Sequence, residues 1–303
     1  MKRVLIKSQK LMKDFFHNYG KIFVISLSII LFLLSLYIYS SLHTTDKLRV
    51  TFFDVGQGDG IFIESPIRRQ AMLDAGPNDI ILRRLSSEMN FFDRDIDVMI
   101  ATHPDADHIT GFINTLTKYN IANVVETYIT GTTDTFHILE NKIDEEDSER
   151  FVAHRGDKID LGGGVTITFV YPNIYRDNVI LKDTNTASIV ALLNYKEINF
   201  LFMGDLPKEK ENEIIMSGLV PRNITVLKVG HHGSKTSSSD MFINYLKPVY
   251  GILSVGKDNR YGHPSIDVVE TLKKYSQSVM STIDYGSITF ETDGHNLEIE
   301  TKK

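Results

Sequence analysis

The ten residues THPDADHITG, at positions 102–111, decide how the rest of this 303-residue chain is interpreted. Four side chains that can bind a metal, His103, Asp105, Asp107 and His108, fall within six residues directly after an apolar strand. Such a loop can point alternate side chains at one spot, and imidazole with carboxylate suits Zn²⁺ or Mn²⁺. A polar surface loop with Asp107 as a helix N-cap explains one carboxylate but neither histidine. We therefore expect a metal site here.

Two more apolar strands end in residues of ligand type. Asp205 follows one of them, and His231 and His232 follow the other. Each is weak alone, because aspartate at a strand end is usually a turn residue. Together, three strand ends that offer histidine and aspartate predict a binuclear metal centre at one edge of a sheet. Asp74 ends a fourth strand, where it either orients a ligand or forms a plain turn.

Composition limits what this site can contain. Cysteine is absent, which excludes disulfides, thiolate zinc sites, iron–sulfur clusters and a cysteine nucleophile. The net charge is −6, but residues 1–40 hold six basic side chains and one acidic one, a charge of +5, so residues 41–303 carry −11. A domain that acidic is a poor non-specific binder of nucleic acid, because neutralising phosphates needs a basic surface.

A membrane anchor is predicted near the N-terminus. Residues 22–40 (IFVISLSIILFLLSLYIYS) carry no charge, and as a helix they would span about 28 Å, close to the ~30 Å hydrocarbon core. The basic residues precede this segment, so the positive-inside rule places the short tail 1–21 in the cytoplasm. A cleaved secretory signal is the alternative, but the apolar run exceeds the usual length of about 7–15 residues. The predicted organisation continues with a linker at 41–47 and one domain at 48–303.

Short apolar strands alternate with helical stretches in that domain, which predicts a layered α/β architecture. A helix is expected from near His108 to Tyr119, and a charged loop over 140–150. Strands are expected at 48–55, 61–64, 70–74, 97–101, 165–170, 188–193, 198–203, 225–229 and 250–255, with a helix at 78–89 and β-rich sequence at 286–300.

Several segments, in order across residues 52–265, resemble the metallo-β-lactamase superfamily, and most closely its ComEC-like branch of extracellular metallo-hydrolase domains. The resemblance implies an αββα sandwich with a two-metal hydrolytic site, here preceded by one N-terminal transmembrane helix. The segments are FFDVGQGDG (52–60), LDAG (73–76), THPDADHITG (102–111), FMGDL (202–206), LKVGHHGSKTSS (227–238) and SVGKDNRYGHPS (254–265).

The family motif assigns a ligand set by position, with Asp205 as the bridging aspartate and His231 as the last histidine. Two divalent ions, zinc or manganese, are the implied cofactors. The implied ligands are His103, Asp105, Asp107, His108, Asp205 and His231.

Two departures from the family pattern concern the first metal position. Asp105 stands where most of the superfamily has histidine, as is usual in the ComEC-like branch. No residue between 109 and 204 is a convincing third histidine, although His137 and His154 are available. The match there is closer to the Asn-x-x-Ser element of the branch, Asn185 to Ser188. Extra oxygen donors favour harder ions, so Mn²⁺ is an alternative to Zn²⁺.

A pair of divalent ions lowers the pKa of a shared water to about 7 and so supplies a hydroxide nucleophile at neutral pH. Asp107 would orient that nucleophile or accept its proton, and His263 would act as general acid for the leaving group. The alternative for His263 is a loop histidine held by its neighbours. The other residues expected to contact substrate or support the ligands are Asp74, Asn185, Ser188, His232, Ser234, Lys235, Asn259 and Tyr261.

Three functions remain open. The resemblance implies a membrane-anchored extracellular phosphodiesterase or nuclease, whose partner would be single-stranded DNA or another phosphodiester. A hydrolase of a small or cell-surface phosphoester or lactone fits the acidity better, and a catalytically silent surface-binding module is the third. The expected location is a bacterial cell membrane, crossed once, with the C-terminal domain outside; no pattern sets an oligomeric state. A nuclease would need a basic rim, for which the candidates are Arg68, Arg69, Arg83, Arg84, Lys228, Lys235, Lys257 and Arg260.

Overall fold

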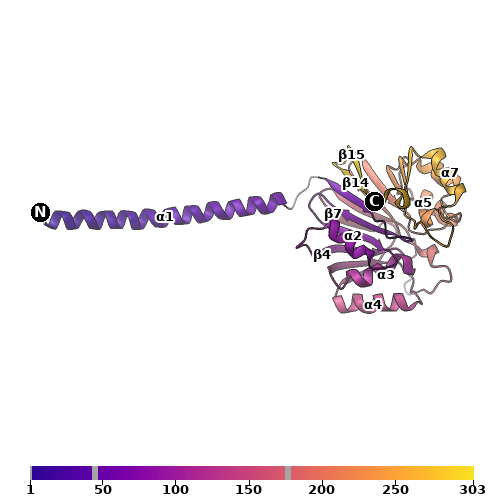
Figure 1. Ribbon diagram of the computed structural model, residues 1–303, viewed down its shortest axis with the longest axis horizontal. Coiled ribbons are helices and arrows are strands. Elements are labelled where there is room, and N and C mark those ends of the chain that lie inside the picture. The colour runs from indigo at the N-terminus through magenta and orange to yellow at the C-terminus, as the bar shows by residue number, and fades with distance from the viewer. Residues whose placement is uncertain (1, 43–46, 175–178) are drawn as a thin grey trace. The chain divides into compact units, whose positions relative to one another are not determined.

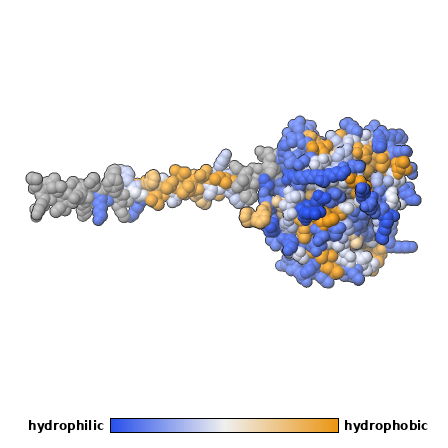
Figure 2. All heavy atoms as spheres, in the orientation of Figure 1, coloured by the Kyte–Doolittle hydropathy of each residue, from blue (hydrophilic) through white to orange (hydrophobic). Residues whose placement is uncertain are grey.

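The computed structural model describes residues 2–42, 47–174 and 179–303. The chain divides into two compact units, Met1–Thr45 and Asp46–Lys303. The first unit is the helix α1 (Lys2–Leu42), which contains an apolar stretch, Tyr19–Tyr39, with a mean hydropathy of 2.6 and no buried residue (Figure 2). This stretch is long and apolar enough to cross a membrane and nearly coincides with the predicted anchor. Most of the expected linker, positions 43–46, lies outside the described residues.

The second unit is built on two mixed sheets (Figure 1). The eight-stranded sheet has the order β15-β14-β1-β2-β3-β4-β5-β6, and the seven-stranded sheet has the order β13-β12-β11-β10-β9-β8-β7. The strands of the first are β1 (Leu48–Phe52), β2 (Gly60–Glu64), β3 (Gln70–Ala75), β4 (Asp95–Ala101), β5 (Asn120–Glu126), β6 (Glu149–Val152), β14 (Ser287–Thr292) and β15 (Leu297–Lys302). Those of the second are β7 (Lys158–Gly162), β8 (Val165–Tyr171), β9 (Val190–Tyr195), β10 (Ile198–Phe202), β11 (Val226–Lys228), β12 (Tyr250–Leu253) and β13 (Ser278–Ser281).

Helices cover the outer face of each sheet and complete the four-layer αββα arrangement. Phe112 of α3, Leu85 of α2 and Leu139 of α4 join one buried cluster with side chains of the first sheet. Phe242 and Leu272 belong to the corresponding cluster on the second sheet. The helices are α2 (Ile80–Glu88), α3 (Ala106–Thr115), α4 (Asp134–Glu146), α5 (Lys208–Met216), α6 (Asp240–Leu246), α7 (Ile266–Tyr275) and α8 (Thr282–Tyr285), with 3₁₀ turns η1 (Thr184–Ala187) and η2 (Gly230–Gly233).

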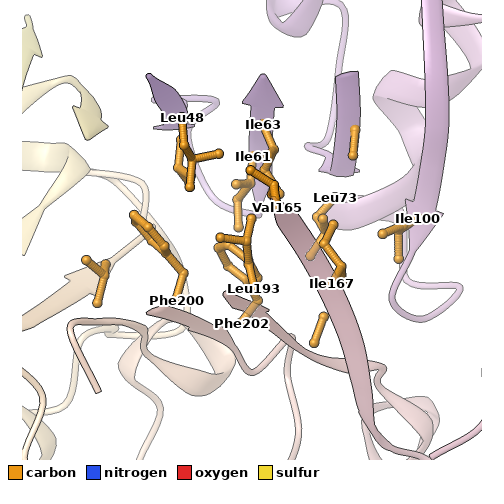
Figure 3. Close-up of a cluster of buried hydrophobic side chains, with 14 of the residues drawn as sticks. Leu48, Ile61, Ile63, Leu73, Ile100, Val165, Ile167, Leu193, Phe200 and Phe202 are labelled. Carbon is orange, nitrogen blue, oxygen red and sulfur yellow. The ribbon is translucent and has the colours of Figure 1, made fainter. Parts of the chain in front are cut away.

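The main core lies between the two sheets, where alternate side chains of each strand meet (Figure 3). Ile61 and Ile63 of β2 face Phe200 and Phe202 of β10. The ring of Phe52 lies 6.1 Å from that of Phe202, centroid to centroid. This packing fixes the spacing of the sheets, and so it fixes the loops at their edges.

The sandwich that the sequence predicts is confirmed. The main error of the prediction lies between positions 120 and 150. The expected charged loop at 140–150 is instead the end of α4 and the start of β6. Phe136, Leu139 and Ile143 recur at helical spacing and are buried, so α4 packs on the sheet although its outer face is acidic. Strand β5 was also not predicted.

Candidate metal centre

The ligand-type residues come from loops that follow three strands. After β4 ends at Ala101, the chain turns through His103 and enters α3, whose first turn carries Asp107 and His108. Asp205 follows β10 after a glycine turn. His232 lies in η2, directly after β11, with a φ of 53°. These loops meet at one edge of the sandwich, which we call the site edge.

Five side chains converge there in overlapping groups of three. His103, His108 and Asp205 form one group, and Asp107, His108 and His232 form another; in each, one potential ligand atom per residue lies within 4.8 Å of the others. The two groups share His108. Asp205 also lies close to both groups, because its Oδ2 is 3.4 Å from His108 Nε2 and 3.3 Å from His232 Nε2. Two adjacent cation positions on either side of Asp205 match this arrangement.

Several nitrogen and oxygen atoms of the cluster have no hydrogen-bond partner in the described part of the chain, and they show whether metal ions would fit there. The Nε2 atoms of His103, His108 and His232, and Oδ1 of Asp205, are buried and have no hydrogen-bond partner among the described residues. Buried polar atoms are rarely left without a partner, because desolvation without compensation costs about 1–3 kcal/mol per group. Imidazole nitrogen and carboxylate oxygen are the donors that Zn²⁺ and Mn²⁺ prefer. The residues present therefore fit divalent ions.

The other ring nitrogens of these histidines are all held by outer partners. Asp74 accepts hydrogen bonds at 2.7 Å from the Thr102 hydroxyl and at 2.7 Å from His108 Nδ1. His103 Nδ1 contacts the Thr102 hydroxyl at 2.9 Å, and His232 Nδ1 donates to the Ser254 carbonyl at 2.9 Å. Fixing Nδ1 in this way aims each Nε2 at the centre of the cluster. Asp74 thus holds His108 by its outer nitrogen, an arrangement that the first of the two roles considered for it requires.

Electrostatics also favour cations at this place. Burial opposes a charge on His108, but the Asp205 and Asp74 carboxylates outweigh it and raise the pKa of His108 well above its ordinary value. The pKa of His232 is raised in the same way, by Asp205 and Asp59 against burial. Burial lowers the pKa of His103 to about 4, so His103 is neutral and ready to ligate. The field of the carboxylates attracts positive charge.

Sequence reasoning missed two buried residues beneath the cluster. Asp59 forms an ion pair with the fully buried Lys228, and its Oδ1 lies 3.5 Å from His232 Nδ1. Lys228 also lies 3.9 Å from Asp205 Oδ1. The loop that carries Asp59 packs against Asp107, because a Cβ at Gly58, whose φ is +128°, would lie 2.0 Å from the Asp107 carbonyl oxygen. The segment FFDVGQGDG contained the signal, but its aspartate was not counted as a site residue.

Of the two adjacent histidines, the structure brings His232 rather than His231 into the groups that could hold a metal. His232 belongs to two of the three-residue groups, whereas His231, expected as the ligand, belongs to none of them in the described part of the chain. His231 Nε2 is 3.6 Å from Asp205 Oδ2, and its Nδ1 contacts the Thr236 hydroxyl at 3.1 Å. His231 is also partly exposed, so it lies at the mouth of the cluster rather than inside it.

The first metal position has an oxygen-rich side. Asp105 Oδ2 lies 3.8 Å from His103 Nε2, and Asp105 Oδ1 accepts a hydrogen bond from Thr184 at 2.5 Å. The side-chain oxygen of Asn185, on the same 3₁₀ turn as Thr184, is buried without a partner, and Ser188 Oγ accepts from the Asp205 amide at 3.2 Å. The Asn185–Ser188 element thus lies where a third histidine is missing. Neither His137 nor His154 belongs to any of the three-residue groups of described residues.

The loop after β12 holds the remaining candidates. The side-chain amide of Asn259 donates to the Gly256 and His263 carbonyls and accepts from the His263 backbone, so Asn259 organises the loop. The rings of Tyr261 and His263 stack with centroids 5.7 Å apart, and His263 meets His231 edge-on at 5.6 Å. Ser234 is buried and bonded to Thr236. A row of rings therefore leads from the exposed Tyr261 to the cluster.

Only part of the expected basic rim lies at the site edge. Lys228 is buried in its ion pair with Asp59, and Arg84 binds Asp54. Arg68 and Arg69 belong to the loop between β2 and β3, at the opposite edge. The exposed cations on loops next to the cluster are Lys235, Lys257 and Arg260.

A comparison with protein families agrees with this architecture. The model of the metallo-beta-lactamase superfamily matches residues 54–257, which is about two thirds of the chain. The chain belongs to the metallo-beta-lactamase superfamily. This fold binds divalent metal ions, often two, and the residues around Asp205 form groups that could hold such ions.

Curated relatives of this family member are competence proteins. The chain is 28% identical to ComE operon protein 3 of Bacillus subtilis over 281 residues, which cover 84% of the chain and 34% of the relative. It is 27% identical to competence protein ComA of Neisseria gonorrhoeae, over 81% of the chain and 32% of the relative. The chain thus spans about a third of the length of these relatives.

Solved structures share the fold at low identity. YhfI of Bacillus subtilis superposes with a TM-score of 0.54 at 12% identity, over 82% of this chain and all of YhfI. CmlA, a diiron β-hydroxylase from Streptomyces venezuelae, gives a TM-score of 0.50 at 10% identity, over 84% of this chain and 54% of CmlA.

Proposed function

We propose that this member of the superfamily is a membrane-anchored, metal-dependent phosphodiesterase whose active domain lies outside the cytoplasm. One observation supports the hydrolase part above all: the buried Nε2 atoms of His103, His108 and His232 and Oδ1 of Asp205 converge without partners. Divalent ions bound there would polarise the phosphoryl oxygen and activate a water molecule. Competence proteins among the relatives favour a phosphodiester substrate.

The protein's own groups would have distinct tasks. Asp107 is half-buried, and its pKa is lowered because His232 and His108 outweigh the effect of burial. Asp107 therefore remains a carboxylate at neutral pH. It could accept a proton from a water molecule bound at the metal site. His263 reaches the cluster through His231, and its pKa is lowered by partial burial and by His231. A lowered pKa leaves His263 largely neutral at pH 7, so His263 is better suited to hydrogen-bond the leaving group at the mouth of the site than to protonate it.

Features of the rim support a polymeric phosphodiester. Arg260 lies over the ring of Tyr261 at 5.1 Å, and Tyr261 is more than half exposed. An exposed aromatic ring with an adjacent cation is typical of sites where nucleic-acid bases stack. The Asp107 carboxylate is among the groups that raise the pKa of Arg260, after the Tyr261 hydroxyl.

A hydrolase of small surface esters is the second candidate, because residues 41–303 carry a net charge of −11 and the rim offers few cations. A salt series separates the two. Nuclease activity should fall as salt rises. Lys257→Gln, which removes one phosphate contact, should reduce the slope of log affinity for DNA against log salt concentration by about 1. Hydrolysis of a small ester should not respond to either change.

The deciding experiment uses the full chain in lipid nanodiscs. Bound metals would be measured by elemental analysis, and apo, Zn²⁺ and Mn²⁺ forms assayed on bis(p-nitrophenyl) phosphate and on single-stranded DNA. We expect metal-dependent cleavage of both that is lost in Asp107→Ala. Metal without cleavage of either substrate would favour the small surface ester, and absence of metal would overturn the enzyme proposal in favour of a binding module.

A further inference from the structure

The loop between α2 and β4 carries two adjacent phenylalanines with little covering them. Phe91 is 79% exposed, and Phe92, at 92%, is the most exposed large hydrophobic side chain in the described part of the chain. Their rings meet edge-on with centroids 5.0 Å apart, so they form one aromatic knob. Single exposed apolar side chains are common, but a contiguous exposed pair indicates a contact surface.

The knob is held in place by its neighbours. Asp93 accepts a hydrogen bond of 2.7 Å from the Gln70 side chain, and the Arg94 carbonyl accepts one of 2.7 Å from the Asn120 backbone. The Arg94 guanidinium lies 5.8 Å from the ring centroids of both Phe91 and Tyr119. The loop is therefore fixed to the first residues of β3 and β5, and the two rings project from a rigid base.

Strand directions place this knob at the edge where the chain enters the domain. Strand β1 runs antiparallel to β2, β2 antiparallel to β3, and β3 parallel to β4. The first residues of β1 and β4, Leu48 and Asp95, therefore lie at the same edge, which we call the tether edge. Three strand spacings separate them, about 14 Å. The site edge is at the opposite ends of these strands.

Chain length keeps the tether edge close to any membrane that α1 crosses. Eight residues, 40–47, separate the apolar stretch Tyr19–Tyr39 from Leu48. A fully extended chain covers at most about 3.3–3.6 Å per residue, so Leu48 stays within roughly 30 Å of the end of the span. The knob is thus among the parts of the domain that the tether brings to the lipid.

We propose that Phe91 and Phe92 insert into the lipid interface of the membrane that α1 spans. This inference rests on the anchor of the proposed function. Phenylalanine side chains with basic residues beside them are typical of protein surfaces that lie in the membrane–water interface. Exposed Arg69 and Arg94 are balanced by Asp93 and Asp95, so the knob suits zwitterionic headgroups rather than an anionic surface. In this orientation the metal cluster opens away from the bilayer.

The sequence contains no tryptophan, so one introduced tryptophan is a unique reporter. The full chain would be reconstituted into phosphatidylcholine vesicles with bromine atoms on the upper acyl chain, as Phe92→Trp and, as a matched control, as Ile266→Trp. Ile266 is 72% exposed and begins α7, where Ser265 bonds to Gly233 near the site edge. We expect severalfold stronger quenching of the tryptophan at position 92.

Flotation of the same vesicles separates the two proposals. If the chain floats with the vesicles but both reporters are quenched equally weakly, the anchor stands and the lipid contact is overturned. If the chain does not float, the anchor itself fails. Crosslinking between two copies through position 92, without bromine quenching, would show that the knob contacts a second copy and would also overturn the inference. Ile67, 42% exposed in the loop before β3 at the tether edge, gives a second reporter as Ile67→Trp. Phe91→Ser/Phe92→Ser should retain the metal content and lower the quenching of this tryptophan.

Discussion

Two clusters of charged side chains in this domain, one at the surface and one buried, differ in where their counter-charge comes from. On the outer side of β5 and β6, Arg150 binds Glu126 at 2.6 Å, Glu140 at 2.8 Å and Asp144 at 3.0 Å, so one side chain of the protein closes the cluster. At the site edge, Lys228 reaches Asp59 from one side, while the atoms around Asp205 face no partner among the described residues. In the metal-free chain the raised pKa values of His108 and His232 let protons carry the counter-charge there, and a divalent ion would displace those protons.

The largest effect is expected from Asp205→Asn. This change removes the carboxylate shared by both cation positions, so bound metal and hydrolysis of bis(p-nitrophenyl) phosphate should fall by more than the roughly 10- to 100-fold that changes in outer partners cost. Elemental analysis and the hydrolysis assay measure both. Asp258→Asn, an exposed carboxylate near the same edge, is the control and should change neither. Full metal content in Asp205→Asn would show that Asp205 is not a ligand.

The two neighbouring histidines allow a sharper test of which side chains belong to the cluster. His232→Asn should release metal, because His232 Nε2 lies 3.3 Å from Asp205 and 3.6 Å from Asp107. His231→Asn should retain it and affect mainly turnover. Titration of each apo variant with Zn²⁺, followed by competition with a chelator, measures the difference. The reverse result would restore His231 as the ligand.

Lys228→Met should break the internal part of the same cluster. It leaves the Asp59 carboxylate buried without its cation, and removal of one partner of a buried ion pair typically costs about 3–5 kcal/mol. Urea unfolding of the metal-free protein measures the loss. The double change Asp59→Asn/Lys228→Met should recover part of it, whereas a double loss equal to the sum of the two single losses would show that the pair is not coupled.

The Arg150 cluster should respond least, and with a defined pH dependence. Burial and the neighbouring Glu140 raise the pKa of Glu126 to about 7. Because the folded state holds a proton that the unfolded state has lost, the free energy of unfolding should fall between about pH 4.5 and 7 and then level off. Glu126→Gln should flatten this slope and add about 1 kcal/mol at pH 8, whereas exposed Glu145→Gln should not. A slope unchanged in Glu126→Gln would assign it to another group.

The fold and most residues of the metal cluster could be predicted from the sequence, because both depend on patterns of neighbouring residues. Alternating apolar residues mark most of the strands, and His103, Asp107, His108 and Asp205 follow strands directly. What a linear pattern does not contain is orientation. His231 and His232 are adjacent, and only the positive φ angles of η2 decide which ring turns inward.

Partnership between distant residues was equally invisible. Lys228 was expected on the surface because lysine usually is, yet it meets Asp59, which lies 169 positions earlier in the chain. The acidic outer face of α4 masked its helical period in the same way, since Arg150, which compensates that charge, lies beyond the helix. Such pairs become apparent only once the strands are in register.

The placement of β1 also governs the order in which the molecule can be completed. Its residues pair on one side with β2 and on the other with β14, so that Leu48 lies opposite Thr292. A nascent chain therefore holds an open strand from its beginning until its last residues are made, and such non-local pairing slows folding. A chain truncated before residue 287 would expose β1 as an edge, with unpaired backbone groups that invite aggregation or proteolysis. Synthesis to the end of the chain is thus a condition for a closed domain.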